Sequence, residues 1–152
     1  VPTVLITNGS RVHTDGVQAG LRAMARAQGQ VWFKLDRVTA AGRLEVNRIQ
    51  GGADRAADQL ALAASCCPTR VQTCMFTVDG QPPDEDELEA YLEFLRGQVR
   101  AGTSLEGVTL YGLARPSMQP GAERLGRVDA AWLETFAERV RVATGLPVAA
   151  HP

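Results

Sequence analysis

The sequence has no long hydrophobic run, and its apolar stretches stay well below the roughly 20 residues that a membrane helix needs. It also has no basic segment followed by an apolar one of the kind that marks a secretory leader. The formal net charge is -1 and the isoelectric point is near 6.1, so no overall field attracts nucleic acid or an anionic membrane. We therefore expect a cytoplasmic protein with neither a membrane nor a nucleic-acid partner.

Cysteine and histidine are scarce. The three cysteines are Cys66, Cys67 and Cys74, and an odd set that contains an adjacent pair is a poor disulfide framework, typical of a reducing compartment. The two histidines, His13 and His151, are far apart in the sequence and fit no metal-ligand spacing. We therefore predict no metal site within this chain.

What the sequence does contain is enough apolar material for one core. Its 152 residues are 45% hydrophobic and 22% charged, and no linker or charge block divides them, so we treat residues 1–152 as a single domain. The chain begins at Val1 and is already in an apolar run by Val4. We expect that the N-terminal part of a larger domain is missing.

Strands and helices are predicted to alternate. Short runs rich in β-branched residues predict strands at 4–6, 31–35, 71–78 and 108–111. Helical spacing of apolar residues predicts helices at about 17–24, 54–65, 88–99 and 133–140. The third helix has the clearest start, because Asp84 and Glu87 have the spacing of a reciprocal capping box.

Four consecutive strand-helix units joined by crossovers of this length favour parallel βα units with right-handed connections. The fold class is therefore α/β. Four units are too few for a complete eight-unit barrel, so we expect part of a partial TIM-like barrel. Its first and last strands would be open edges, and a missing N-terminal barrel segment or a second subunit would have to cover them.

Ligands of parallel α/β folds bind where the strands end, so the informative residues follow each apolar run. Those segments are 7–10, 34–36, 72–80 and 111–117. In the second, Lys34 and Asp36 are two positions apart and share a face, and Lys34 is the only lysine in the chain. The alternative for this pair is an ordinary surface ion pair at the rim.

The other segments also have purely structural alternatives. Asn8 and the glycine after it can form a strand-ending turn. Tyr111 can be a core residue, and Arg115 can cap a helix instead of binding a carboxylate or phosphate. Gly51 and Gly52 precede a helix and could bind an anion at its N-terminus, although two glycines alone specify no ligand.

The order of these motifs resembles the later strands of the radical S-adenosylmethionine (radical SAM) superfamily. Within it, the sequence is most similar to the iron-sulfur oxidoreductases of the tRNA wybutosine-synthesis and glycyl-radical-activating kind. The motifs that carry the resemblance are ITNGS at 6–10, VWFKLD at 31–36, VQT at 71–73, VTLYGLARP at 108–116 and TGLPV at 144–148.

The resemblance implies a partial parallel barrel, strands three to six of which lie in this chain. In that family S-adenosylmethionine lies across the strand ends, and a [4Fe-4S] cluster cleaves it to a carbon radical. Thr7 and Asn8 would then lie on the third strand near the methionine part. Lys34 and Asp36 would lie on the fourth, near the ribose or carboxylate. The contacts that would flank ribose and adenine from the fifth and sixth strands are Gln72, Thr73, Leu110 and Tyr111.

The sequence departs from the family at its hallmark. It lacks the C-x3-C-x2-C motif after the first strand and the glycine-rich strand that contacts the methionine amine, and its own cysteines have another spacing. Both features normally precede the region that is similar here. The resemblance therefore implies that the cluster ligands belong to the rest of the parent protein, and that this chain alone is inactive.

Two other functions remain open from the sequence. The chain could belong to an aldolase-like or phosphate-binding barrel in which Lys34 forms a Schiff base, provided that it is desolvated. It could also be a non-catalytic half-barrel that associates with itself. No residue identifies a substrate.

Overall fold

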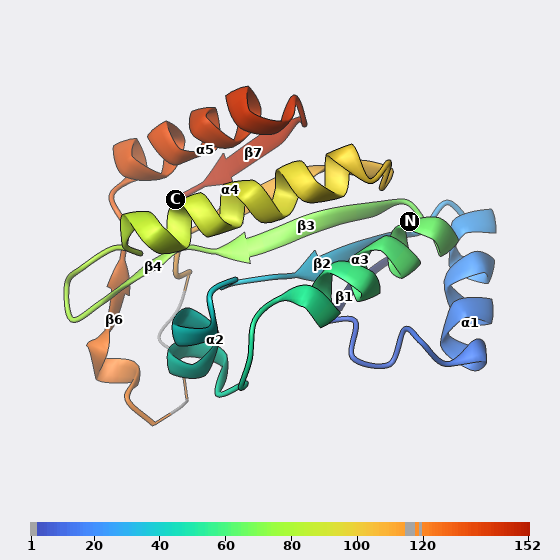
Figure 1. The fold of residues 1–152 in the computed structure, drawn as a ribbon, viewed down its shortest axis with the longest axis horizontal. Helices are drawn as coiled ribbons and strands as arrows, with labels where there is room; N and C mark the ends of the chain where they lie inside the picture. The colour runs from blue at the N-terminus through green and yellow to red at the C-terminus, as the bar shows by residue number, and fades with distance from the viewer. Residues whose placement is uncertain (1–2, 115–117, 119) are drawn as a thin grey trace.

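The computed structural model describes residues 3–114, 118 and 120–152, and a five-stranded parallel sheet is its centre (Figure 1). The strand order is β1, β2, β3, β5 and β7, and every neighbouring pair is parallel. The bounds of the strands are Val4–Thr7 for β1, Gln30–Lys34 for β2, Thr69–Cys74 for β3, Leu105–Tyr111 for β5 and Val148–His151 for β7. This confirms an α/β fold of consecutive βα units.

Helices connect successive strands of the sheet. They are α1 (Asp15–Arg26), α2 (Ala40–Asn47), α3 (Asp54–Cys66), α4 (Glu85–Arg100) and α5 (Ala130–Thr144). The four helices α1, α3, α4 and α5 follow one another across one face of the sheet, with α1 packed on α3 and α4 packed on α5. In the part of the chain that the structure describes, no helix is both long and apolar enough to cross a membrane.

Three parts of the fold differ from the sequence prediction. The run 71–78 is not one strand, because β3 ends at Cys74 and the chain leaves the sheet as β4 (Phe76–Val78). That strand pairs antiparallel with β6 (Leu125–Arg127), which follows the short 3-10 helix η1 (Ala122–Arg124). Helix α2 was not predicted because it buries none of its residues and so has no apolar stripe. Strand β7 was not predicted because it is short and contains two alanines.

Alternation along the strands separates an apolar face from a more polar one. Val31 and Phe33 on β2, Val71 on β3, and Val108 and Leu110 on β5 are all 0% exposed and belong to one core with the helices. In the register of the sheet, Phe33, Val71 and Val108 are direct neighbours across three strands. The core therefore lies on one side of the sheet, between the strands and the helix layer.

One polar contact is buried inside this core. The Thr73 hydroxyl donates to the Leu35 carbonyl at 2.8 Å and lies 2.7 Å from the Tyr91 hydroxyl on α4. Desolvation raises the pKa of the Tyr91 hydroxyl, and the hydrogen bond to Thr73 only partly opposes it. A buried hydroxyl needs such a partner, so this bond fixes α4 over the end of β3.

The start of α4 is capped on one side only. The Asp84 carboxylate accepts from the Glu87 backbone amide at 2.8 Å, as the sequence predicted. The buried Glu87 carboxylate does not return the bond. It accepts from the backbone amides of Val38 and Thr39 and from the Thr39 hydroxyl. A tertiary contact has replaced half of the capping box, and it holds the chain between β2 and α2 against α4.

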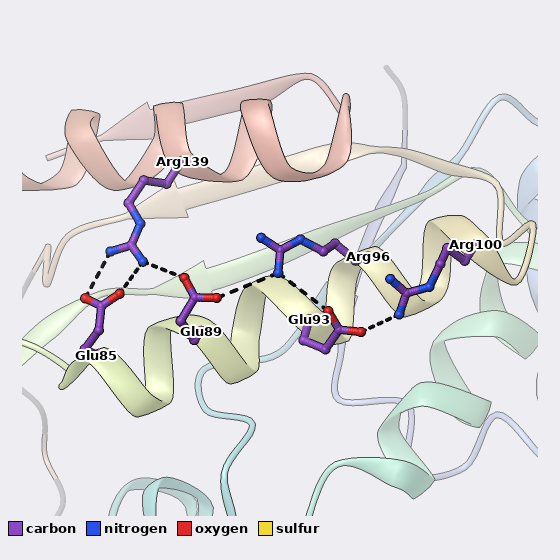
Figure 2. A network of polar contacts seen from close by, with 6 residues as sticks. All are labelled: Glu85, Glu89, Glu93, Arg96, Arg100 and Arg139. Atoms are coloured by element: carbon purple, nitrogen blue, oxygen red, sulfur yellow. Dashed lines mark hydrogen bonds and ion pairs between the residues drawn. The ribbon is translucent and has the colours of Figure 1, made fainter.

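An ion-pair network joins α4 to α5 on the outer surface (Figure 2). Arg139 on α5 reaches Glu85 and Glu89 on α4, at 3.0 Å from the latter. Along α4 the network continues from Glu89 through Arg96 to Glu93, which also pairs with Arg100. Pairing with arginine lowers the pKa values of Glu85 and Glu93. Because these pKa values are lower in the folded than in the unfolded protein, the ion pairs add to the free energy of unfolding above the unfolded pKa. That stabilisation is lost as the pH falls through the folded pKa.

Tyr91→Phe is expected to lower the free energy of unfolding by about 1 kcal/mol, because it removes one buried hydrogen bond and keeps the ring. In a Thr73→Val background the same change is expected to be neutral or stabilising, because the Tyr91 hydroxyl then has lost its partner. Urea denaturation of the four proteins of this cycle measures both values. An equal cost in the two backgrounds would show that the hydroxyls do not interact.

Candidate functional site

The second face of the sheet carries most of the polar strand residues, and we call it the open face. Its members form rows across the strands, because parallel pairing places residues of the same parity side by side. The rows are Ile6, Trp32 and Arg70; then Lys34, Gln72 and Thr109; then Cys74, Tyr111 and His151. The polar residues thus become more numerous toward the carboxyl ends of the strands, where ligands of such folds bind.

Asp36 organises the end of β2. One carboxylate oxygen accepts from the Cys74 backbone amide at 3.0 Å, and the other pairs with the Lys34 ammonium group. The Asp36 side chain is 4% exposed, whereas that of Lys34 is 42% exposed. The pair is therefore not an ordinary surface contact: a buried carboxylate holds a half-exposed ammonium group at the rim.

Cys74 and Tyr111 lie side by side at the ends of β3 and β5. Burial raises the pKa of the Cys74 thiol, and the nearby Asp36 carboxylate raises it further. Burial also raises the pKa of the Tyr111 hydroxyl, with added contributions from Cys74 and Asp36. Both groups therefore keep their protons at neutral pH and can act as hydrogen-bond donors there.

The middle of the open face holds two further polar groups. The Arg70 guanidinium donates to the Thr109 hydroxyl at 3.1 Å. The indole Nε1 of Trp32 is buried and has no hydrogen-bond partner among the described residues. A buried donor without a partner is uncommon in folded proteins, and Trp32 lies next to Arg70 in the same row of the open face.

The structure divides the eight residues predicted to bind a cofactor. Three of them lie on the open face: Lys34, Gln72 and Tyr111. Asp36 lies just beyond Lys34, after the end of β2. Asn8 is exposed beyond β1 and lines a pocket together with Lys34 and Asp36. The three residues whose side chains belong to the helix-covered face are Thr7, Thr73 and Leu110.

That division follows from the period of two along a strand. Gln72 and Thr73 are adjacent and must point to opposite faces, as must Leu110 and Tyr111. Thr73 and Leu110 are 0% exposed, so their side chains cannot reach a ligand on the open face. For Gln72 and Tyr111, which face away from the core, a role in cofactor binding stays a prediction.

A large pocket opens beside the open face, at the carboxyl ends of β1 and β2. It has a volume of about 620 Å³ and extends from Asn8 and Lys34 to α2 and the first turn of α3. We call it the basic pocket, because its lining contains Lys34, Arg37, Arg43, Arg48 and Arg55, with Asp36 as the carboxylate. Sequence reasoning missed the four arginines. Arg37 directly follows the strand-end segment 34–36, whereas the other three are distant from the predicted strand ends.

The cysteines do not converge on one place. Cys66 and Cys67 lie before the first residue of β3, and Cys74 is its last residue, so the length of the strand separates them. Among the described residues, no group of three or more histidine, cysteine or acidic side chains has the geometry of a metal site. Arg115, which could pair with a carboxylate or phosphate, lies outside the described residues.

Two open-face residues outside the predicted set could have been found from the sequence. Trp32 and Arg70 occupy the same parity as Lys34 and Gln72, two positions earlier on each strand. Extending the alternation backward would have found both. His151 could not be placed in this way, because β7 itself was not predicted.

All three thiols are expected to react slowly in the native protein. They are buried, and desolvation raises the pKa values of Cys67 and Cys74, which lowers the thiolate fraction at neutral pH. Labelling with Ellman's reagent should therefore be slow before unfolding and complete for three thiols in guanidinium chloride. A fast native phase for any one thiol would contradict this arrangement.

Comparison with known proteins shows a likeness in fold. A scan against family models finds no match, and a search of curated proteins finds none. A radical SAM methyltransferase from Sphaerobacter thermophilus, solved by crystallography, superposes with a TM-score of 0.64 at 16% sequence identity. The superposition covers 97% of this chain and 40% of that protein. The chain therefore has the α/β fold of part of a radical SAM enzyme, and it spans less than half of that enzyme's length.

Proposed function

We propose that this chain is the S-adenosylmethionine-contacting part of a radical SAM enzyme. The observation that carries the proposal is the open face: its polar side chains gather at the carboxyl ends of parallel strands, in a fold similar to that of a radical SAM methyltransferase. The sequence resemblance leads to the same family independently of the superposition. The finer likeness to wybutosine-synthesis and activating enzymes rests on the sequence motifs alone.

The side chains that would hold the cofactor fit its chemistry. Tyr111 offers an aromatic ring for the adenine and a protonated hydroxyl, and Gln72 offers an amide to the ribose hydroxyls. Lys34, held by Asp36, offers a cation to the carboxylate. When bound together with a reduced cluster, S-adenosylmethionine supplies a carbon-centred radical.

The cluster does not fit this chain, because its cysteines lie at both ends of β3 and have the wrong spacing. We infer that its ligands come from the remainder of the parent protein. The sheet has room for that segment, since β1 and β7 are its two outer strands. Val4 and Ile6 on β1 are 42% and 55% exposed, and an added strand or a second subunit would cover them.

The alternative of a Schiff-base aldolase receives less support. A lysine becomes a nucleophile when an apolar or cationic environment desolvates it. Lys34 has a half-exposed side chain and a carboxylate partner instead. A self-associating half-barrel is favoured by one observation, the exposed apolar residues of β1, and a stable dimer without cofactor binding would support it.

The proposal is tested by isothermal titration of S-adenosylmethionine into the protein in its natural length. Gln72→Ala and Tyr111→Leu are each expected to weaken binding about tenfold, because each removes a contact worth roughly one buried hydrogen bond or stacked ring. Lys34→Ala should weaken binding similarly.

Thr73→Val is the matched control. It is adjacent to Gln72, yet its side chain faces the helices, so the affinity should not change while circular dichroism confirms the fold. Absence of saturable binding would refute the proposal. If the Gln72 and Thr73 variants lowered the affinity equally, the open face would not be the binding surface.

A further inference from the structure

The basic pocket carries more positive charge than the protein itself neutralises. Five of its lining side chains are cationic and one is a carboxylate. That carboxylate, Asp36, is already paired with Lys34. Among the described residues, none of the four arginines of the pocket forms an ion pair with a carboxylate.

Arg37 is the most deeply placed of these cations. It is 4% exposed, donates to the Asp36 carbonyl at 2.7 Å, and its guanidinium carbon lies 4.5 Å from the centre of the Phe76 ring. Burial lowers the pKa of Arg37, and Glu87 and Asp36 partly oppose that change from a distance. A buried arginine is normally paired directly with a carboxylate or with a bound anion. Among the described residues, Arg37 has a ring and a carbonyl in place of such a partner.

Arg43 on α2 adds a second unsatisfied group. Its Nε is buried and has no hydrogen-bond partner among the described residues. Leaving a buried guanidinium donor unpaired destabilises the folded protein. The side chain as a whole is half-buried and lines the pocket, so an anion there can contact its guanidinium group. The two arginines approach the pocket from different elements, so no local feature of one helix explains both.

The start of α3 faces the same space. Its N-cap residue, Ala53, offers no side-chain acceptor. The first turn begins with the exposed Asp54 and continues with Arg55 and Ala56, which line the pocket. Gly51 and Gly52 precede it, and apart from their chain neighbours no described atom lies within 4 Å of where a side chain would begin at either position. A ligand can therefore approach the free backbone amides, which favour an anion together with the helix dipole.

We propose that the basic pocket binds the phosphate group of an organic phosphate monoester. Guanidinium forks and helix amides together match the oxygens of a phosphate dianion better than the two oxygens of a carboxylate. The volume of about 620 Å³ is that of a small-molecule site and leaves room for the organic part. This inference goes beyond the cofactor proposed above and does not depend on it.

The test titrates ribose 5-phosphate, with ribose and acetate as comparisons, at constant ionic strength by calorimetry. We expect saturable binding of the phosphate ester only. Arg43→Ala and Arg37→Ala should each weaken it about tenfold or more, because each removes a charge-assisted hydrogen bond. Arg22→Ala is the matched control, since Arg22 is exposed on α1, does not line the pocket, and donates to the Gln18 side chain.

Arg48→Gly separates binding from folding. Arg48 ends α2 with a positive φ of 57°, a conformation that glycine adopts without strain. The variant should keep or raise the melting temperature of the protein while lowering its affinity for the phosphate ester. Equal loss of binding in the Arg22 variant, equal affinity for acetate, or no binding at all would overturn the inference. The Gln72 and Tyr111 variants should bind ribose 5-phosphate normally, so this result and that for S-adenosylmethionine can fail separately.

Discussion

The carboxylate of Asp36 is the interaction on which the rest of the candidate site depends. The carboxylate accepts a hydrogen bond from the Cys74 amide, at the last residue of β3, and pairs with the Lys34 ammonium group. The backbone carbonyl of Asp36 accepts a hydrogen bond from Arg37. One buried residue thus joins the ends of two strands and orients two cations in different directions. Lys34 lies at the border between the open face and the basic pocket, whereas Arg37 is inside the pocket.

This arrangement separates two kinds of chemistry at one edge of the sheet. On the open face the polar groups are mostly neutral, and the raised pKa values of Cys74 and Tyr111 keep them protonated. In the basic pocket the groups are permanent cations contributed by the β2 end, α2 and α3. A cofactor and a charged substrate could therefore occupy neighbouring positions without competing for the same side chains, apart from Lys34.

The period of hydrophobic residues was enough to predict the α/β class, the parallel units and the first four strands of the sheet. It could not predict β7, whose alanines carry little signal, or α2, which has no buried residue. The same limit applied to the site. Strand ends led to Lys34 and Tyr111, which lie on the open face, and also to Thr73 and Leu110, which face the helices, because the sequence did not show which face of each strand is covered. The basic pocket depends on residues brought together only by the tertiary fold.

Because of the glutamate and arginine network of Figure 2, the two helix contacts of the layer depend differently on salt and pH. On the side of α4 and α5, surface charges contribute to the contact, and added salt screens them. No described ion pair joins α1 to α3, whose contact is apolar and indifferent to screening. Added salt or mild acid therefore weakens the charged part of the α4–α5 contact, while the buried packing of Tyr91 on Phe136 remains. The α1–α3 contact has no such charged part among the described residues, so the two sides of the helix layer differ in how much of their packing depends on surface charge.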